Sequence, residues 1–76
     1  MGESKENAVV AAAWPVFLRY GFKRTTMADL AQAAGMSRPA LYLVFSSKED
    51  IFTALMEKAF SEILVQIRSN LAVATQ

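Results

Sequence analysis

The sequence predicts an all-α protein in which three short helices form a bundle and a fourth, much longer helix extends from it. Two observations support this fold class. Apolar residues recur at helical spacing along almost the whole chain, and no alternating strand pattern lasts more than a few residues. Ser, Thr and Gly stand where helices begin and end, and they divide the chain into four segments. At 76 residues, the chain has the length of one small domain or of part of one.

The chain begins with a polar stretch, residues 1–7, which we expect to be a disordered tail. A first helix follows from residue 8 and ends at Gly21, a residue that tolerates left-handed geometry. Pro15 lies inside this helix, where it removes a backbone hydrogen bond, so we expect a kink or a late start. The spacing i, i+3, i+4, i+7 assigns the buried face to Val10, Ala13, Trp14 and Phe17.

Thr26 begins a second helix, and Asp29 completes a capping box with it. Its inner face is predicted to consist of Met27, Leu30, Ala31 and Ala34, and Gly35 ends it. A third helix, about 38–45, has Ser37 or Arg38 as N-cap and Pro39 in its first turn. Its inner residues are predicted to be Leu41, Val44 and Phe45.

Ser47 is the predicted N-cap of a fourth helix over 48–76, with Asp50 at the reciprocal position. Its apolar residues recur every four positions, from Ile51 to Leu71. Because each such step overshoots a full turn by roughly 40°, the two ends of the helix face different directions. The first half can therefore pack on the bundle, whereas the second half needs another partner. A hydrophobic content of 54% is consistent with an apolar surface that lacks its partner here.

Composition removes several classes of function. The chain has no Cys and no His, which excludes disulfides, zinc fingers, thiolate nucleophiles and histidine acid–base chemistry, and we expect no metal or cofactor. The apolar run 8–18 is too short to span a bilayer, and the charges before it are net negative where a signal peptide needs positive charge. We therefore expect a cytoplasmic protein without membrane contact, and no enzyme.

The second and third helices, about 26–45, have the spacing of a homeodomain-like helix-turn-helix. Ala31 is small where the third helix crosses, Gly35 permits the turn, and Leu41 fills the angle between the helices. Arg38, Pro39, Ala40 and Tyr42 would then project outward from the start of a recognition helix. Arg38 suits guanine, and the Tyr42 hydroxyl suits phosphate.

Further contacts to the DNA backbone are predicted at helix starts. Thr25 and Thr26 precede the second helix, whose free N–H groups suit a phosphate. Lys48 is unfavourable for the dipole of its own helix, so we interpret it as a phosphate ligand. The distribution of charge is also consistent with contacts to DNA. The whole chain has a net charge of +1, but residues 19–48 contain five basic residues and one acid.

The segment Phe17–x3–Gly21, the thirteen residues Thr25–Ser37, Leu41-Tyr42 and Phe45–x2–Lys48-Glu49 resemble the TetR family of transcriptional regulators. The resemblance covers about residues 8–56 and implies a DNA-binding domain whose third helix reads the major groove. It implies that the helix over 48–76 leads to a larger domain, absent here, that forms a homodimer and binds a small-molecule effector. In the family, the positions of Thr26, Arg38, Pro39, Ala40, Tyr42 and Lys48 commonly touch DNA.

Three features depart from the family pattern, and the first is Pro15, which is unusual in the first helix. Leu43 and Val44 stand where an Arg or aromatic residue and a His or Tyr are common, which leaves Leu43 as an exposed apolar residue for a thymine methyl group. The effector domain would extend beyond Gln76, so we expect the chain to be part of a longer, ligand-responsive repressor that binds a pseudo-palindromic operator; a naturally short protein is the alternative. The candidate DNA-contacting residues are Thr25, Thr26, Ser37, Arg38, Pro39, Ala40, Tyr42, Leu43 and Lys48.

A second class of function remains open from the residues alone. The apolar stripe of the last helix would also suit a helical module that binds other proteins. The two interpretations separate at Arg38, because only DNA binding depends on that side chain. The members of the stripe are Phe60, Ile63, Leu64, Ile67 and Leu71.

Overall fold

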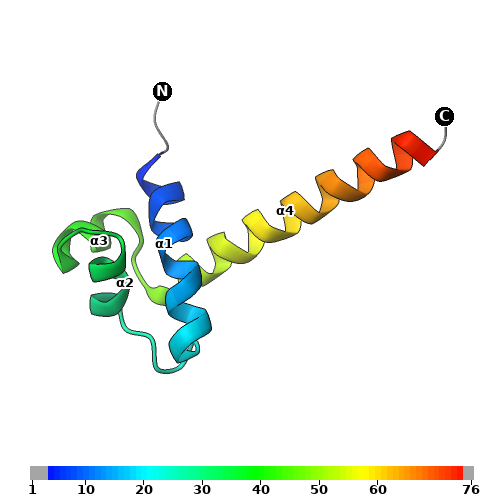
Figure 1. Cartoon of the computed structure of the whole chain (residues 1–76). Coiled ribbons are helices and arrows are strands. Elements are labelled where there is room, and N and C mark those ends of the chain that lie inside the picture. Colours follow the sequence, from blue (N-terminus) through cyan, green and yellow to red (C-terminus); the bar gives the residue numbers. More distant parts are fainter. Residues whose placement is uncertain (1–3, 75–76) are drawn as a thin grey trace.

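A computed structural model describes residues 4–74 of the chain, with side chains described as far as Leu71. Within these residues the fold is all-α and contains four helices. They are α1 (Lys5–Tyr20), α2 (Met27–Ala33), α3 (Arg38–Val44) and α4 (Lys48–Ala74). The first three form a compact bundle from which α4 projects as a long arm (Figure 1). The predicted fold class is confirmed.

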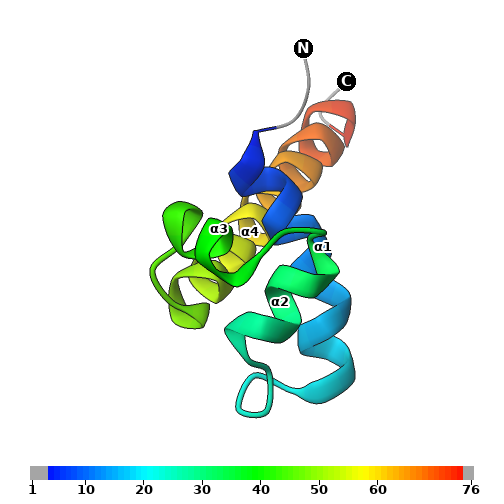
Figure 2. The same cartoon turned by 90° about the vertical axis from the view of Figure 1, so that its left-hand side faces the viewer.

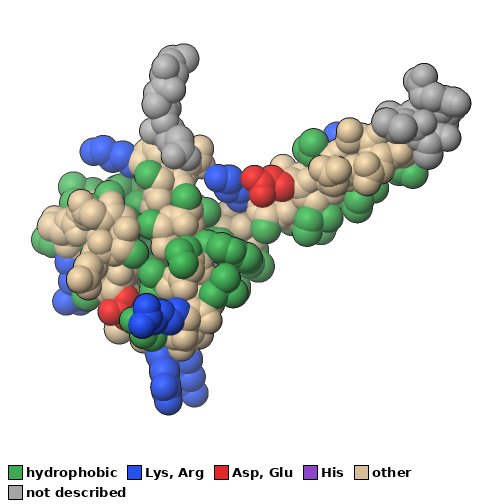
Figure 3. All heavy atoms as spheres, viewed as in Figure 1, with side chains coloured by type: hydrophobic (Ala, Val, Ile, Leu, Met, Phe, Trp, Pro, Cys, Tyr) green, Lys and Arg blue, Asp and Glu red, His purple; other side chains and the backbone are tan. Residues whose placement is uncertain are grey.

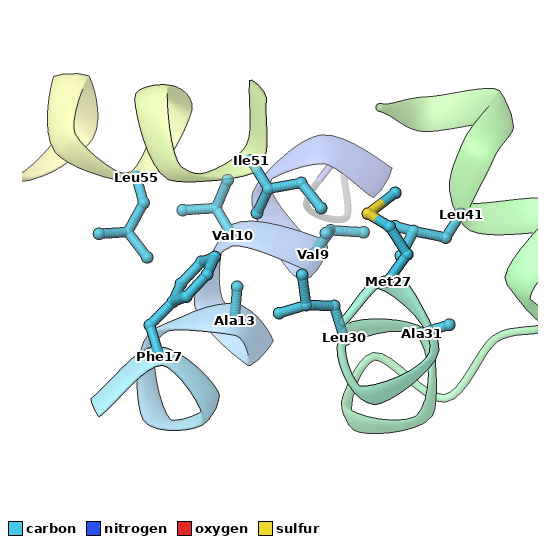
Figure 4. Packing of buried hydrophobic residues seen from close by; sticks show 10 residues of the cluster. All are labelled: Val9, Val10, Ala13, Phe17, Met27, Leu30, Ala31, Leu41, Ile51 and Leu55. Carbon is cyan, nitrogen blue, oxygen red and sulfur yellow. The ribbon is translucent and has the colours of Figure 1, made fainter. Parts of the chain in front are cut away.

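Helix α1 is the centre of the bundle. It packs against both α2 and α4, and α3 is held mainly by α2. Figure 2 looks at the face formed by α2 and α3, with α4 receding behind them. The side chains that meet between the helices are Val9, Val10, Ala13 and Phe17 of α1, Met27, Leu30 and Ala31 of α2, Leu41 of α3, and Ile51 and Leu55 of α4 (Figure 4).

The start of α1 corrects the predicted tail. Ser4 is the N-cap, and its hydroxyl oxygen accepts a hydrogen bond of 3.1 Å from the backbone N–H of Asn7. Residues 4–7 therefore belong to the cap and first turn of a helix, and residues 1–3 of the predicted tail lie outside the described residues. The helix runs through Pro15 and ends at Gly21, where φ is +80°. The late start that Pro15 suggested does not occur.

The buried face of α1 differs from the prediction at one residue. Trp14 is 45% exposed, whereas Val9, which the spacing did not select, is completely buried. Because α1 contacts two helices, its buried face spans the directions of both Val9 and Val10, which point about 100° apart around the helix axis. Trp14 lies about 40° beyond Val10 around the helix, at the edge of that face. It lines an open groove of about 340 Å³ between α1 and α4.

The predicted boundaries of α2 and α3 agree closely with the structure. Thr26 and Asp29 form both bonds of the capping box, each 3.1 Å long. Ser37 is the N-cap of α3, and its hydroxyl oxygen accepts from the N–H of Ala40 at 3.2 Å. Helix α3 ends at Val44, one residue before its predicted end, and Phe45 is its C-cap.

Helix α4 has two unlike halves. The N–H of Asp50 donates to the hydroxyl oxygen of Ser47 at 3.2 Å, as expected of an N-cap. Ile51 and Leu55 are buried against the bundle. From Phe60 to Leu71, by contrast, the large apolar side chains are exposed, and most of the green side chains of the arm lie along its lower side (Figure 3). No helix in the described part of the chain is long and apolar enough to cross a membrane.

Candidate nucleic-acid interface

Helices α2 and α3 meet at an angle fixed by three features. Ala31 is 2% exposed and lies where α3 approaches α2, so a larger side chain would separate the helices. Leu41 is completely buried and lies beside Met27 (Figure 4). Gly35 adopts φ +70° in the turn between the helices. The packing predicted for a helix-turn-helix is therefore present.

The turn after α2 is a Schellman motif. The N–H of Met36 donates to the carbonyl oxygen of Ala31 at 3.0 Å, and the N–H of Gly35 donates to that of Gln32 at 3.1 Å. This pair of bonds defines the motif and places Gly35 in its left-handed position. Met36 then packs against the core as the apolar residue that commonly accompanies the motif.

One side of α3 is turned outward. Leu41 is buried and Val44 and Phe45 are partly buried against the core, so most of the other side chains of the helix face solvent. Tyr42 is 45% exposed and Leu43 is 89% exposed. Arg38 and Pro39 are also exposed, and Ala40 is partly buried at the edge. The helix thus presents a guanidinium group, a phenol and an isobutyl group together, which suits base edges and thymine methyl groups.

Thr26 and Ser37 lie exposed at the starts of the two helices. Each hydroxyl oxygen accepts a hydrogen bond from the backbone N–H three residues later. These bonds use an oxygen lone pair and leave the hydroxyl proton for another acceptor. Both side chains therefore keep a donor that suits a phosphate oxygen.

Thr25 differs from the prediction. Its side chain is only 1% exposed, and its hydroxyl group donates to the carbonyl oxygen of Gly21 at 2.7 Å. Its backbone N–H donates to the same oxygen at 3.1 Å. The side chain closes the α1–α2 turn, which we define as residues 21–26, and it is not presented to a ligand.

Lys48, the predicted phosphate ligand, has hydrogen-bond partners within the chain. Its ammonium group donates to three backbone carbonyl oxygens of the α1–α2 turn, those of Phe22 at 2.7 Å, Lys23 at 3.1 Å and Thr25 at 3.0 Å. An ammonium group has three N–H donors, so this set uses all of them. A cation at the start of α4 therefore does not require a phosphate, because these carbonyl groups already surround its charge. They lie 23 to 26 residues earlier in the chain, and no local pattern points to them.

Three aromatic rings support this arrangement, and the sequence did not single them out as a group. The ring centroids of Phe17 and Phe22 lie 5.7 Å apart, and Phe52 meets them edge-on at 5.4 and 5.1 Å. The cluster joins the end of α1, the turn and the first two turns of α4. The ammonium nitrogen of Lys48 lies 4.5 Å from the centre of the Phe22 ring.

The other cations of the positive segment are exposed: Arg19, Lys23, Arg24 and Arg38. Lys and Arg side chains project from the end of the molecule that carries the α1–α2 turn (Figure 3). Asp29, the one acid of the segment, is engaged in the capping box. The bundle therefore keeps its positive charge accessible to a polyanion.

Comparisons with known proteins agree with this geometry. Residues 9–55 match the family model described as bacterial regulatory proteins, tetR family. An uncharacterised HTH-type transcriptional regulator, YfiR of Bacillus subtilis, is 38% identical over 60 residues, which cover 79% of this chain and 29% of YfiR.

Two solved structures are also similar. MexZ, described as a key repressor responsible for antibiotic resistance in Pseudomonas aeruginosa, superposes with a TM-score of 0.74 at 41% identity over 78% of this chain and 30% of MexZ. The fatty acid degradation regulator FadR from Bacillus halodurans superposes with a TM-score of 0.82 at 27% identity, over 92% of this chain and 37% of FadR. The chain thus spans about a third of the length of these relatives.

Proposed function

The chain belongs to the TetR family of bacterial regulatory proteins, and from that premise we propose that it is the DNA-reading part of a transcriptional repressor. The observation that carries the proposal is the outward face of α3. Arg38, Tyr42 and Leu43 are exposed there on a helix whose angle to α2 is fixed by Leu41. The first residues of such a helix reach base edges in the major groove.

The DNA backbone would be held around this helix. Thr26 and Ser37 offer hydroxyl donors at the two helix starts, and Pro39 and Ala40 allow close approach beside them. The exposed cations of residues 19–38 add a contribution that is independent of base sequence and weakens with salt. Affinity should therefore fall steeply between about 50 and 200 mM salt.

Control of transcription would need parts that lie outside these residues. We infer a homodimer that places two copies of α3 about one DNA turn apart, roughly 34–36 Å, on a pseudo-palindromic operator in the cytoplasm. A small-molecule effector bound in a further domain would change that separation and release the DNA. We propose repression because MexZ, at 41% identity, is described as a repressor.

The test is capture of genomic DNA by the protein, followed by sequencing of the bound fragments. We expect enriched fragments to share an inverted repeat and the complete repeat to bind much more tightly than one half. The 76-residue chain alone should bind weakly, since it forfeits the linked second contact. A single half-site that binds the full-length dimer as tightly as the complete operator would overturn the dimer model.

A protein-interaction module is the second candidate, and the exposed stripe of α4 favours it. Phe60 and Leu71 are 63% and 60% exposed, far more than residues of a finished core. The two functions are compatible, because dimerisation is itself helix packing. Loss of genomic DNA capture in the Arg38→Ala variant would support DNA reading, whereas an interaction module would be indifferent to that change.

A further inference from the structure

We propose that Lys48 is a positioning residue and not a phosphate ligand: its ammonium group holds the α1–α2 turn against the first turn of α4. The inference deepens the proposed function and rests on it where DNA is concerned. It begins from the three carbonyl oxygens of Phe22, Lys23 and Thr25, which converge on one nitrogen within 2.7 to 3.1 Å. Hydrogen bonds to a charged donor are the stronger kind.

The environment explains why a lysine is tolerated at this position. A cation at the start of a helix meets the positive end of the helix dipole, which is unfavourable. Here the negative ends of three carbonyl dipoles and the face of the Phe22 ring surround the charge and offset that cost. Phe17 and Phe52 hold the Phe22 ring in place from α1 and α4. The three carbonyl oxygens and the Phe22 ring thus form a cation-binding site, and the ammonium group of Lys48 occupies it.

The consequence concerns how the parts of the bundle are joined. Helix α4 packs on α1, and α3 is carried by α2. Lys48 adds a direct link from the start of α4 to the segment that leads into α2, because Thr25, whose carbonyl it binds, is followed by Thr26, the N-cap of α2. Removal of this link should loosen the turn and lower DNA affinity without removing a phosphate contact.

The first experiment measures the turn without any DNA. The backbone N–H of Thr25 donates a hydrogen bond to the carbonyl oxygen of Gly21, so its exchange reports whether the turn is closed. We expect its hydrogen exchange to accelerate at least about tenfold in both Lys48→Met and Lys48→Arg, since a planar guanidinium cannot replace a compact ammonium among three carbonyls. Lys23→Met is the matched control, because it removes an exposed lysine of the same turn, and exchange should stay unchanged. Unchanged exchange in both Lys48 variants would overturn the proposal.

The second experiment measures affinity for a random-sequence duplex as a function of salt. A positioning role predicts the same slope of log affinity against log salt for Lys48→Met as for the unchanged protein. A phosphate ligand predicts a slope smaller by about 0.9 in Lys48→Met and restored in Lys48→Arg. That second pattern would overturn the proposal.

A third measurement needs no variant, so it remains decisive if the substituted chains fail to fold. An amine-reactive reagent followed by mass spectrometry compares Lys48 with Lys23. We expect Lys48 to react at least about tenfold more slowly, with or without DNA, because its donors are engaged in the free protein. Equal rates in the free protein, with protection of Lys48 by DNA, would contradict this. If the protein binds no DNA at all, exchange and labelling still decide the role of Lys48, while the proposed function fails separately.

Discussion

Arg38 occupies the first position of α3, exposed beside Pro39 and one turn before Tyr42. Because a guanidinium group forms two parallel hydrogen bonds to guanine, we expect Arg38→Ala to weaken binding to the selected operator by about 1–3 kcal/mol. The free energy of unfolding should change by less than about 0.5 kcal/mol, since an exposed side chain is removed. Operator titration and urea unfolding of the same preparation measure the two effects.

Arg38→Lys is the matched control for this prediction. It keeps the charge, so affinity for random-sequence DNA and its salt dependence should remain, whereas discrimination for the operator should be lost with the bidentate geometry. Wild-type operator affinity in Arg38→Ala would show that the recognition helix reads DNA without this residue.

At the scale of single residues, only part of the candidate site could be predicted from the sequence. Periodicity alone identifies which residues of α3 face outward, and Tyr42 and Leu43 are exposed as expected. It says nothing about partners far away in the sequence. The burial of Thr25 and the engagement of Lys48 depend on a turn closed by Gly21 and on carbonyl groups more than 20 residues before Lys48. Such contacts arise from the folded arrangement and leave no local signature.

At the scale of elements, the turn between α2 and α3 depends on the conformation of Gly35. A Cβ atom added there would meet nothing within 4 Å, so the cost of a side chain is conformational and not steric. With φ at +70°, we expect Gly35→Ala to destabilise the protein by about 1–2 kcal/mol. Gly35→Asn should cost less, because asparagine tolerates the left-handed region.

Urea unfolding of the three proteins tests this, with operator affinity measured beside it. An equal loss in the alanine and asparagine variants would mean that the left-handed conformation does not set the cost. No loss in either would mean that the turn can leave the Schellman geometry freely.

Helix α1 illustrates what periodicity does and does not determine. The apolar spacing correctly predicts a helix that ends at Gly21 and buries Ala13 and Phe17. The centre of its buried face, however, depends on where α2 and α4 lie, and this shift buries Val9 and exposes Trp14. The order and type of the elements are therefore contained in local pattern, whereas the rotation of each helix is set by its neighbours.

At the scale of the whole molecule, the net charge of +1 hides an uneven distribution. Residues 19–48 have a net charge of +4, and in the structure four of their five cations are exposed, while Lys48 is turned to backbone carbonyls. The acids lie mainly outside this segment. A surface of this kind favours a polyanion at the bundle and leaves the arm to apolar contacts.

The two halves of α4 should respond differently to substitution. Leu55, 3% exposed, belongs to the core, so Leu55→Ala should cost about 2–5 kcal/mol of unfolding free energy. Ile63 and Ile67 are 55% and 48% exposed on the stripe, so replacing both with Glu should change the free energy of unfolding little. Their exposure in one continuous stripe predicts self-association of the chain at rising concentration, which the double variant should abolish.

Sedimentation over a concentration series, with urea unfolding of the same samples, measures both effects. Gln66→Glu is the control. Gln66 is exposed and lies between the two isoleucines in the sequence, and the change adds a negative charge without removing apolar surface. It should associate like the unchanged chain, because the attraction comes from the apolar side chains. A chain that stays monomeric at every concentration, or a control that loses association as fully as the double variant, would remove the stripe as an interface. DNA reading by α3 would be unaffected by that result, because Ile63 and Ile67 lie on the projecting arm and Arg38 lies on the bundle.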